Sequence, residues 1–154
     1  MILVTVGTEQ FPFNRLMDWI QVLINRGFIQ EEIVVQYGSC TDWPYGVKAY
    51  SLLTQDKFLD LIQQARLIIG HCGEGTFLLL GATPKPYILV PRSQSLGEHV
   101  DDHQIELAAA LDQIEIPIAW SPGDLVRFLA LPRSVPPATV STASFCQRLK
   151  NRFG

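Results

Sequence analysis

The chain has 154 residues, of which 47% are hydrophobic and 18% charged, and its mean hydropathy is +0.17. This composition predicts one folded domain and argues against disorder, collagen-like repeats and linkers. Lys and Arg number 12 and Asp and Glu 15, so no basic excess exists for binding the phosphate backbone of a nucleic acid. The high hydropathy indicates apolar surface that a partner would cover.

The three cysteines, Cys40, Cys72 and Cys146, are widely spaced and form no CxxC pair. They predict neither a disulfide framework nor a thiolate zinc site, and they fit a reducing, cytoplasmic setting. Cys72 and its neighbour His71 would point to opposite faces of a strand, so we expect a packing residue rather than a nucleophile. We expect no signal peptide and no membrane-spanning helix, and therefore a soluble chain.

The first half of the chain alternates apolar runs with helical spacing. Residues 2–6 form a β-branched run that ends at Gly7, which predicts a strand buried on both faces. Apolar residues three and four apart predict a helix over 16–24 that stops at Gly27. The next expected elements are two strands and a helix, over 33–36, 47–52 and from Thr54 or Asp56 to Ile62.

The second half repeats this alternation. A fourth strand over 67–70 leads into a glycine-rich turn, and a short helix over 77–82 follows it. The remaining expected elements are a strand over 87–90, a helix from near Asp101 to Leu111, a weaker sixth strand over 116–119, a helix starting at Ser121-Pro122, and a terminal helix over 141–152.

Strands that alternate with amphipathic helices predict βαβ units. The right-handed crossover of such units places helices on both faces of the sheet. The expected fold is α/β, a Rossmann-like doubly wound parallel sheet of about six strands. We expect this Rossmann-like domain to span residues 1–131 and a proline-rich segment with a short helix to span 132–154.

The turn after the fourth strand, from His71 to Thr76, is the strongest candidate site. Ligands of open parallel sheets bind at the carboxyl ends of the strands. Gly73 and Gly75 would let the backbone approach a ligand, and the helix that follows offers free N–H groups, which together predict a diphosphate cradle. A tight turn without a ligand is the alternative. The dinucleotide fingerprint is broken, because Leu78 stands at its third glycine position.

A second polar segment, 91–104, follows the fifth strand. His99 and His103, four residues apart, would share a helix face if the helix began early enough, and with a third ligand they would form a metal site. We favour an acidic helix start instead, with the acids at 101–102 stabilised by the helix dipole. Gln104 fits either contacts to sugar hydroxyls or plain solvation.

Four segments of the chain share their pattern and order with a known family. They are Val4 to Thr8 followed by Phe13 to Leu16, His71 to Thr76, Lys85 to Arg92, and Leu96 to Ala108. Together they resemble the C-terminal, donor-binding half of MurG-type GT-B glycosyltransferases. The resemblance is closer to the small catalytic subunits of two-component enzymes, both the PssE type of bacterial exopolysaccharide synthesis and the dolichol-linked GlcNAc transferases, and it covers about residues 1–125.

The resemblance implies roles for individual residues. The HxGxGT turn falls on His71 to Thr76 and implies contacts to the donor's diphosphate. The His-Gln pair falls on His103 and Gln104 and implies contacts to the transferred sugar. The predicted substrate-binding residues are Gly7, Thr8, His71, Gly73, Glu74, Gly75, Thr76, Arg92, Glu98, His103 and Gln104.

Four residues bear on the predicted chemistry in other ways. Glu9, just past the first strand, is the expected general base, with a solvated loop acid as the alternative. Arg92, at a strand end, and Arg15, in a first helical turn, are each expected to face the diphosphate. Leu79 stands where many relatives carry a Glu that binds the ribose, so the ribose must be recognised differently.

The resemblance implies the catalytic subunit of a two-component inverting glycosyltransferase. It would transfer a hexose or N-acetylhexosamine from a UDP-sugar to a lipid-linked acceptor in polysaccharide biosynthesis, with no metal or other cofactor. The acceptor-binding half is missing, which implies a membrane-associated partner subunit at the inner face of the membrane. A homodimer in its absence remains open.

Two other functions remain open from the sequence. One is a non-catalytic nucleotide-sugar-binding module. The other is a small Rossmann-type oxidoreductase, which the broken fingerprint and the lack of an acidic residue at the end of the second strand argue against.

Overall fold

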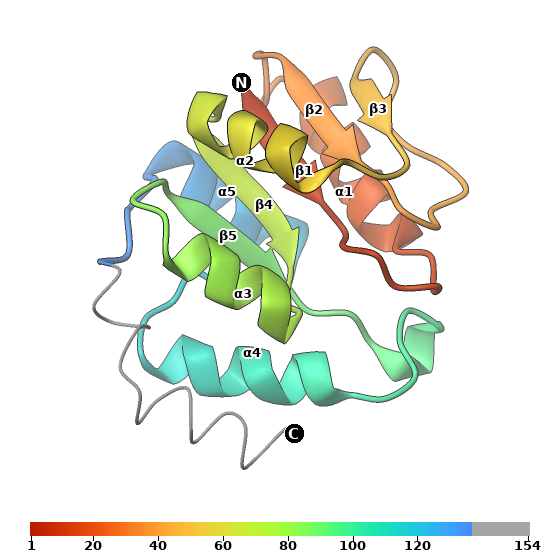
Figure 1. Ribbon diagram of the computed structural model, residues 1–154, viewed down its shortest axis with the longest axis vertical. Coiled ribbons are helices and arrows are strands. Elements are labelled where there is room, and N and C mark those ends of the chain that lie inside the picture. Colours follow the sequence, from red (N-terminus) through yellow and green to blue (C-terminus); the bar gives the residue numbers. More distant parts are fainter. Residues whose placement is uncertain (137–154) are drawn as a thin grey trace.

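The structure, a computed structural model, describes residues 1–136 and contains a parallel five-stranded sheet covered by helices (Figure 1). The strands are β1 (Ile2–Thr5), β2 (Ile33–Gln36), β3 (Lys48–Tyr50), β4 (Leu67–His71) and β5 (Tyr87–Val90). Their order across the sheet is β3-β2-β1-β4-β5. Every neighbouring pair is parallel, so the predicted doubly wound α/β fold is confirmed.

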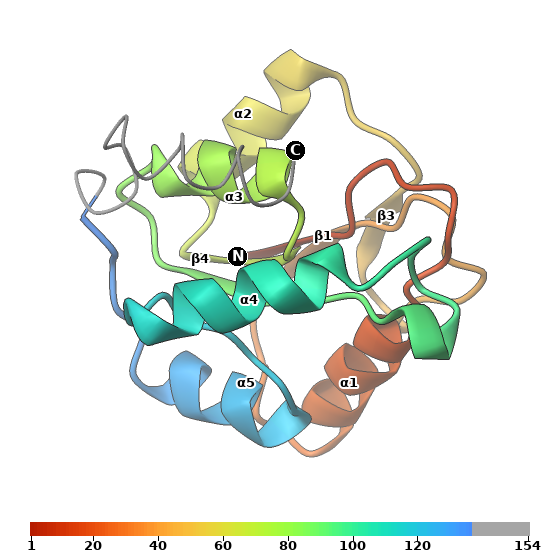
Figure 2. The same cartoon turned by 90° about the horizontal axis from the view of Figure 1, so that it is seen from below.

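Helices connect the strands and form two layers. They are α1 (Asn14–Asn25), α2 (Gln55–Gln64), α3 (Glu74–Gly81), α4 (His103–Gln113) and α5 (Pro122–Ala130), with a short 3₁₀ turn, η1 (Gln94–Leu96). Figure 2 shows α1 and α5 on one side of the sheet and α2 and α3 on the other. Thr54 and Ser121 cap α2 and α5 by accepting the backbone N–H of the residue three positions on, as their sequence predicts.

Two apolar cores lie on the two faces of the sheet. Leu3 of β1 packs into the core that includes residues of α2, α3 and α4, whereas Ile2 and Val4 pack into the core that includes α1 and α5. This alternation follows from the two-residue period of a strand, and it requires apolar residues at successive positions. The continuous apolar runs of the sequence are therefore explained by burial on both faces.

The order of the strands reverses between β1 and β4. The chain passes from β1 to β2 and β3 on one side, then returns to β4 beside β1 and continues to β5. Thr5 pairs with Gly70 in this register, so both strands end at the same place. A crevice is expected where the strand order reverses, between the loop after β1 and the turn after β4.

One helix begins earlier than its apolar pattern predicts. The expected helix over 77–82 starts at Glu74, because Gly73 adopts an extended backbone (φ −84°, ψ 148°) and serves as its N-cap. The glycine-rich turn thus forms the first turn of α3 rather than a linker before it. This difference places free backbone N–H groups closer to the end of β4 than the sequence suggested.

The sixth strand is reduced to one bridge. Ile118 pairs in parallel with Leu89 of β5, and the segment continues no further as a strand. Pro117 within this segment has no N–H to donate, which is the physical reason for the weak pairing. The terminal helix expected over 141–152 lies outside the described residues.

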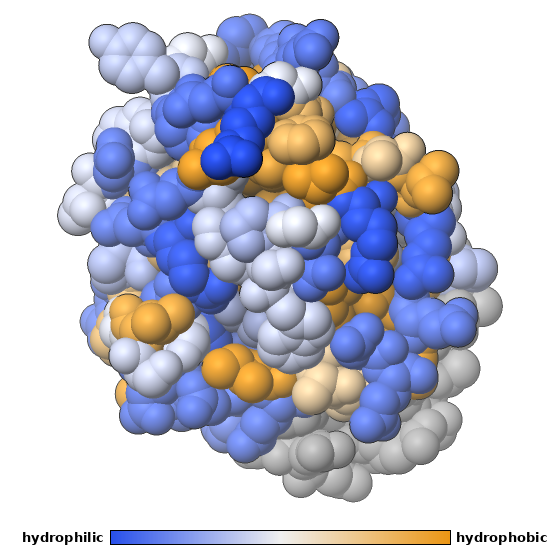
Figure 3. Space-filling model, turned by 180° about the vertical axis from the view of Figure 1, so that it is seen from behind, coloured by the Kyte–Doolittle hydropathy of each residue, from blue (hydrophilic) through white to orange (hydrophobic). Residues whose placement is uncertain are grey.

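The surface around α1 and α5 is mixed in character. Seen from behind, apolar residues lie in patches separated by polar and charged ones (Figure 3). Large apolar side chains such as Phe28, Trp120 and Leu131 are exposed. Within the described residues, none of the helices combines the length and apolar character that crossing a bilayer requires.

Candidate functional site

A cleft of about 470 Å³ opens at the carboxyl ends of β1 and β4. Its walls come from the loop after β1, the end of β2, the β3–α2 connection with α2, and the β4–α3 turn. The predicted site residues that line it are Gly7, Thr8, Glu9, His71, Gly73, Glu74, Gly75 and Thr76. The structure therefore brings together two loops that more than sixty residues separate in the chain.

The first turn of α3 presents backbone N–H groups to this cleft. Gly73, the N-cap, has no side chain to accept from the amides of Glu74, Gly75 and Thr76, and the first intrahelical bond joins the Phe77 N–H to the Gly73 carbonyl. Free amides and the positive end of the helix dipole favour an anionic group here. A diphosphate matches this arrangement in charge and in its supply of acceptor oxygens.

The imidazole of His71 lies between Gly7, in the loop after β1, and Gly73, in the β4–α3 turn. A Cβ atom at Gly7 would lie 2.3 Å from Nε2 of this ring, and one at Gly73 would lie 2.5 Å from its Cε1. Gly7 also has a φ of +76°, which L side chains rarely adopt. Both glycines are therefore required by the position of the histidine, whereas a Cβ at Gly75 would meet nothing within 4 Å.

His71 is a buried and neutral group. Its Nε2 lies 2.9 Å from the Thr76 hydroxyl and its Nδ1 lies 3.1 Å from the amide nitrogen of Gln104. Burial, together with the charges of Arg92 and His99, lowers the pKa of His71 from 6.5 to about 3. The ring thus contributes hydrogen bonds to the site and no positive charge.

Gln36, at the end of β2, holds the loop after β1 in place. Its side-chain oxygen accepts from the Thr5 hydroxyl (2.6 Å) and from the Gly7 N–H (3.2 Å). Its side-chain nitrogen donates to the carbonyls of Gly7 and Ser51, both at 2.9 Å. One buried amide therefore ties together three of the segments that line the cleft.

Arg92 does not face the cleft, contrary to the sequence-based expectation. It is fully buried, and its guanidinium donates to the backbone carbonyls of Val6, Phe11 and Glu98. The Cζ atom of its guanidinium lies 4.9 Å from the centroid of the Phe13 ring, which adds to this packing. Arg92 thus supports the loop after β1 from the interior of the fold. Charge reversal here would disturb folding and not donor binding alone.

Arg15 and Glu98 also lie outside the lining of the cleft. They form a bidentate ion pair with two N···O distances of 2.9 Å, and Glu98 further accepts from the Ser93 N–H. Arg15 also donates to the Pro91 carbonyl and lies 4.7 Å from the Trp19 ring. This closed pair fixes α1 against the segment after β5, and it lies outside the cleft in which both side chains were expected to contact substrate.

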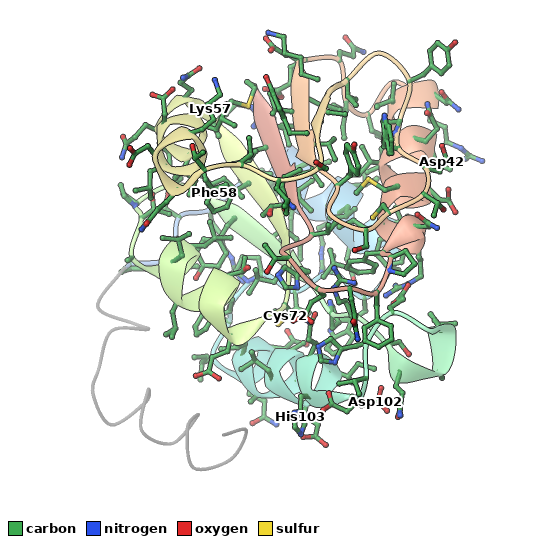
Figure 4. All side chains as sticks on the ribbon, turned by 45° about the vertical axis from the view of Figure 1, so that its right-hand side comes forward. Asp42, Lys57, Phe58, Cys72, Asp102 and His103 are labelled. Atoms are coloured by element: carbon green, nitrogen blue, oxygen red, sulfur yellow. The ribbon has the colours of Figure 1, made fainter. Side chains whose placement is uncertain are left out.

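The His-Gln pair is divided between surface and interior. His103 is the first residue of α4 and 54% of its side chain is exposed; Figure 4 shows it beside Asp102, away from Phe58 of α2. Gln104 is buried, with its oxygen accepting from the Arg92 N–H (3.1 Å) and its nitrogen facing His71. The structure therefore places Gln104 against His71 and His103 at the surface, and neither residue lines the cleft.

The structure bears on the two hypotheses for His99 and His103, a metal site and an acidic helix start. Because α4 begins at His103, His99 lies before the helix and the two rings do not share a helix face. Both ring Nδ1 atoms contact Asp101, at 3.0 and 3.1 Å. Among the described residues, no group of three or more His, Cys, Asp or Glu side chains is placed to hold a metal ion.

Cys72 is a packing residue, as the sequence predicts. It is fully buried in the core beneath α3, and burial raises the pKa of its thiol to about 12. Such a thiol is not a nucleophile at neutral pH, so the cleft contains no thiolate chemistry from this position.

The described lining of the cleft contains two carboxylates and no Lys or Arg side chain. Among the described residues that line it, Glu9 and Glu74 are the acids, and none is Lys or Arg. Glu9 is partly exposed and lies 3.8 Å from Nε2 of His99. Binding of an anion at this site must therefore rest on backbone amides, hydroxyls and the helix dipole, or on cations from outside this chain.

Six lining residues were not predicted from the sequence. They are Thr5, Gln36, Leu52, Leu53, Gln55 and Phe58. A polar residue ending a buried strand was the one available signal, and it applies to Gln36 and to Thr5, the last residue of β1. The other four lie in the β3–α2 connection or in α2, and their place in the cleft depends on the strand order.

The comparisons with known proteins concern the family and the fold of this chain. The model of the glycosyltransferase family 28 C-terminal domain matches residues 1–130. A curated Mus musculus protein, UDP-N-acetylglucosamine transferase subunit ALG13, is 30% identical over 115 residues, which are 70% of this chain and 10% of that protein. This chain thus spans about a tenth of the length of that relative.

Two solved structures match this chain, and the first is similar in fold. The glycotransferase of kitacinnamycin has a TM-score of 0.54 and 16% identity, over 97% of this chain and 37% of that one. The glycosyltransferase SnogD from Streptomyces nogalater has a TM-score of 0.45 and 19% identity, over 84% of this chain and 43% of that one. The first of these likenesses shows the fold, and the chain spans less than half of either protein.

Proposed function

From the premise that this chain belongs to the glycosyltransferase family 28 C-terminal domain, we propose that it binds a UDP-sugar in the cleft between β1 and β4. In this proposal it is the donor-binding subunit of a two-component inverting glycosyltransferase. A hydroxyl of a lipid-linked acceptor attacks the anomeric carbon of the hexose or N-acetylhexosamine, and UDP leaves.

The first turn of α3 is the observation that carries this proposal. Three uncapped amides at Glu74, Gly75 and Thr76 line the cleft, at the point where the strand order reverses. These groups would bind the diphosphate and stabilise the charge that develops on it as the sugar departs. The proposal assigns no step to a metal, so activity should persist in a chelator such as EDTA.

A partner subunit is part of the proposal. The cleft has no basic side chain among its described lining residues, and two acids lie in it. The curated mouse relative is itself named as a subunit. We propose that the partner supplies the acceptor site, attaches the complex to the membrane and contributes positive charge near the diphosphate.

Glu9 is the proposed general base. It lies at the rim of the cleft, on the loop directly after β1, with its side chain 43% exposed. A carboxylate in this position is free to accept a proton from an incoming hydroxyl. Full activity of Glu9→Gln in the reconstituted complex would show that the base lies elsewhere.

Calorimetric titration tests donor binding directly. We expect UDP to bind the wild-type chain and NAD not to bind, and equal binding of both would favour an oxidoreductase instead. Transfer of labelled sugar to a lipid acceptor, measured with and without the partner, then distinguishes an enzyme from a non-catalytic module. UDP binding without transfer under any condition would support the module.

A further inference from the structure

A chain of hydrogen bonds runs from the backbone of Arg92 through Gln104 and His71 to Thr76 at the wall of the cleft. Each link is within ordinary hydrogen-bond distance: 3.1 Å from the Arg92 nitrogen to Gln104, 3.1 Å from Gln104 to His71, and 2.9 Å from His71 to Thr76. Three of the four residues are buried, and the outer two, His71 and Thr76, line the cleft. The bond from the Arg92 N–H determines which group donates and which accepts in each of the following hydrogen bonds.

The orientation of the Gln104 amide follows from the Arg92 backbone. A backbone N–H can only donate, so the atom of Gln104 that faces it must be the oxygen. The amide nitrogen therefore faces His71 and donates to Nδ1. A flipped amide would set two donors against each other in a buried site, which costs about 1–3 kcal/mol for each group left unpaired.

The tautomer of His71 follows from the Gln104 amide. Because Nδ1 accepts, the proton of the neutral ring is on Nε2, and this N–H donates to the Thr76 hydroxyl. The ring cannot turn away, since it lies between the backbones of Gly7 and Gly73. Within the part of the chain that the structure describes, His71 is the one side-chain hydrogen-bond partner of Thr76.

We propose that Gln104 and His71 are positioning residues that fix the Thr76 hydroxyl as a hydrogen-bond donor to the diphosphate of the donor substrate. The inference rests on the proposed function. A hydroxyl whose oxygen already accepts from Nε2–H directs its own proton outward. Diphosphate oxygens only accept hydrogen bonds. A Thr76 hydroxyl that donates therefore adds to the α3 amides, in a cleft whose described lining residues include no Lys or Arg.

The ligand-free protein gives the first test. Long-range ¹H–¹⁵N correlation spectra distinguish the protonated from the unprotonated nitrogen of each ring, and the His71→Gln variant identifies the signals of His71. We expect a neutral ring with its proton on Nε2 from pH 5 to pH 8. A proton on Nδ1, or an imidazolium in this range, would overturn the relay.

Variants of Thr76 test the outer end by calorimetric titration with UDP. Thr76→Val, which removes the hydroxyl but keeps the shape, should weaken UDP binding about tenfold, the effect of one hydrogen bond to a charged group. Thr76→Ser, which keeps the hydroxyl, is the matched control and should bind within about twofold of wild type on the same principle. Wild-type affinity in Thr76→Val would overturn the proposal.

A double-mutant cycle separates positioning from mere structural support. Gln104→Met should weaken UDP binding in the wild-type background but have little further effect beside Thr76→Val, because both changes remove the same contact. Additive losses would show that Gln104 acts through the fold and not through Thr76. A ring protonated at Nε2 in a protein that binds no UDP would instead overturn the proposed function and this ligand.

Discussion

The turn after β4 and the segment after β5 are both polar in sequence, yet their roles in the structure differ. Residues 71–76, apart from Cys72, line the cleft, and the first turn of α3 presents free backbone amides there. Residues 91–104 carry more ionisable side chains, and of these Arg92 and Glu98 are buried in contacts with other parts of the chain. The first segment lines the cleft, and the second supports it.

This difference shows what a motif can and cannot indicate. A motif locates the segment that approaches a ligand, because strand ends and helix starts are set by local patterns. It does not tell whether a charged side chain reaches outward to the ligand or inward to backbone carbonyls. At Arg92 the inward direction is fixed by three carbonyls from segments that only the tertiary fold brings together.

The largest expected effect concerns the supporting segment. Arg92→Met should lower the free energy of unfolding by about 3 kcal/mol or more, because buried carbonyls lose their charged donor. Urea unfolding measures this, and Arg127→Met, at a surface ion pair with 67% of the Arg127 side chain exposed, should change stability by less than about 0.5 kcal/mol. Wild-type stability of Arg92→Met with loss of UDP binding would restore Arg92 as a ligand contact.

The glycines of the two loops give the next largest effect. Gly7→Ala and Gly73→Ala should each weaken UDP binding by about tenfold or more, since the new Cβ must displace the His71 ring. Gly75→Ala is the matched control on the same turn, where a Cβ meets nothing within 4 Å. Comparable losses in all three variants would show that helix-start flexibility, and not the packing around His71, governs binding.

A moderate effect is expected for stability at acidic pH. The pKa of His71 is about 3 in the folded chain and 6.5 as its ordinary value, so the unfolded chain takes up the proton first as the pH falls. The contribution of the neutral His71 ring to the free energy of unfolding is complete above pH 6.5 and is lost toward pH 3. Between pH 7 and pH 5 the free energy of unfolding should fall by about 2 kcal/mol from this cause.

Urea unfolding at these two pH values measures the loss, with His71→Gln as the reference. The variant should lack this component of the pH dependence. An identical pH dependence in both proteins would mean that His71 is not held neutral by burial.

The smallest expected effect concerns a residue that lines the cleft without supporting the fold. Gln55, the first residue of α2, is exposed and belongs to the lining of the cleft. Gln55→Ala should weaken UDP binding by about twofold to tenfold, the range for one neutral hydrogen bond, and leave urea unfolding unchanged. A loss of stability instead would place Gln55 with the supporting residues.

The sequence predicted the fold and part of the lining of the cleft for identifiable reasons. Burial on both faces makes the strands continuous apolar runs, and glycines mark the turns at their ends. The contribution of Gln36 was not predictable, because it depends on β2 lying beside β1 and on the β3–α2 connection passing close to both. The same holds for Gln104, whose burial is set by the packing of α4 and not by its place at a helix start.

The central claim is that the amides at the start of α3 hold the diphosphate. Titration of the ¹⁵N-labelled wild-type chain with UDP tests it residue by residue. The account predicts that the largest amide shifts occur at Glu74, Gly75 and Thr76, with smaller ones at Gly7 and Thr8, and that NAD causes none of them. Shifts that concentrate in another part of the chain, or an unperturbed α3 at saturating UDP, would contradict it.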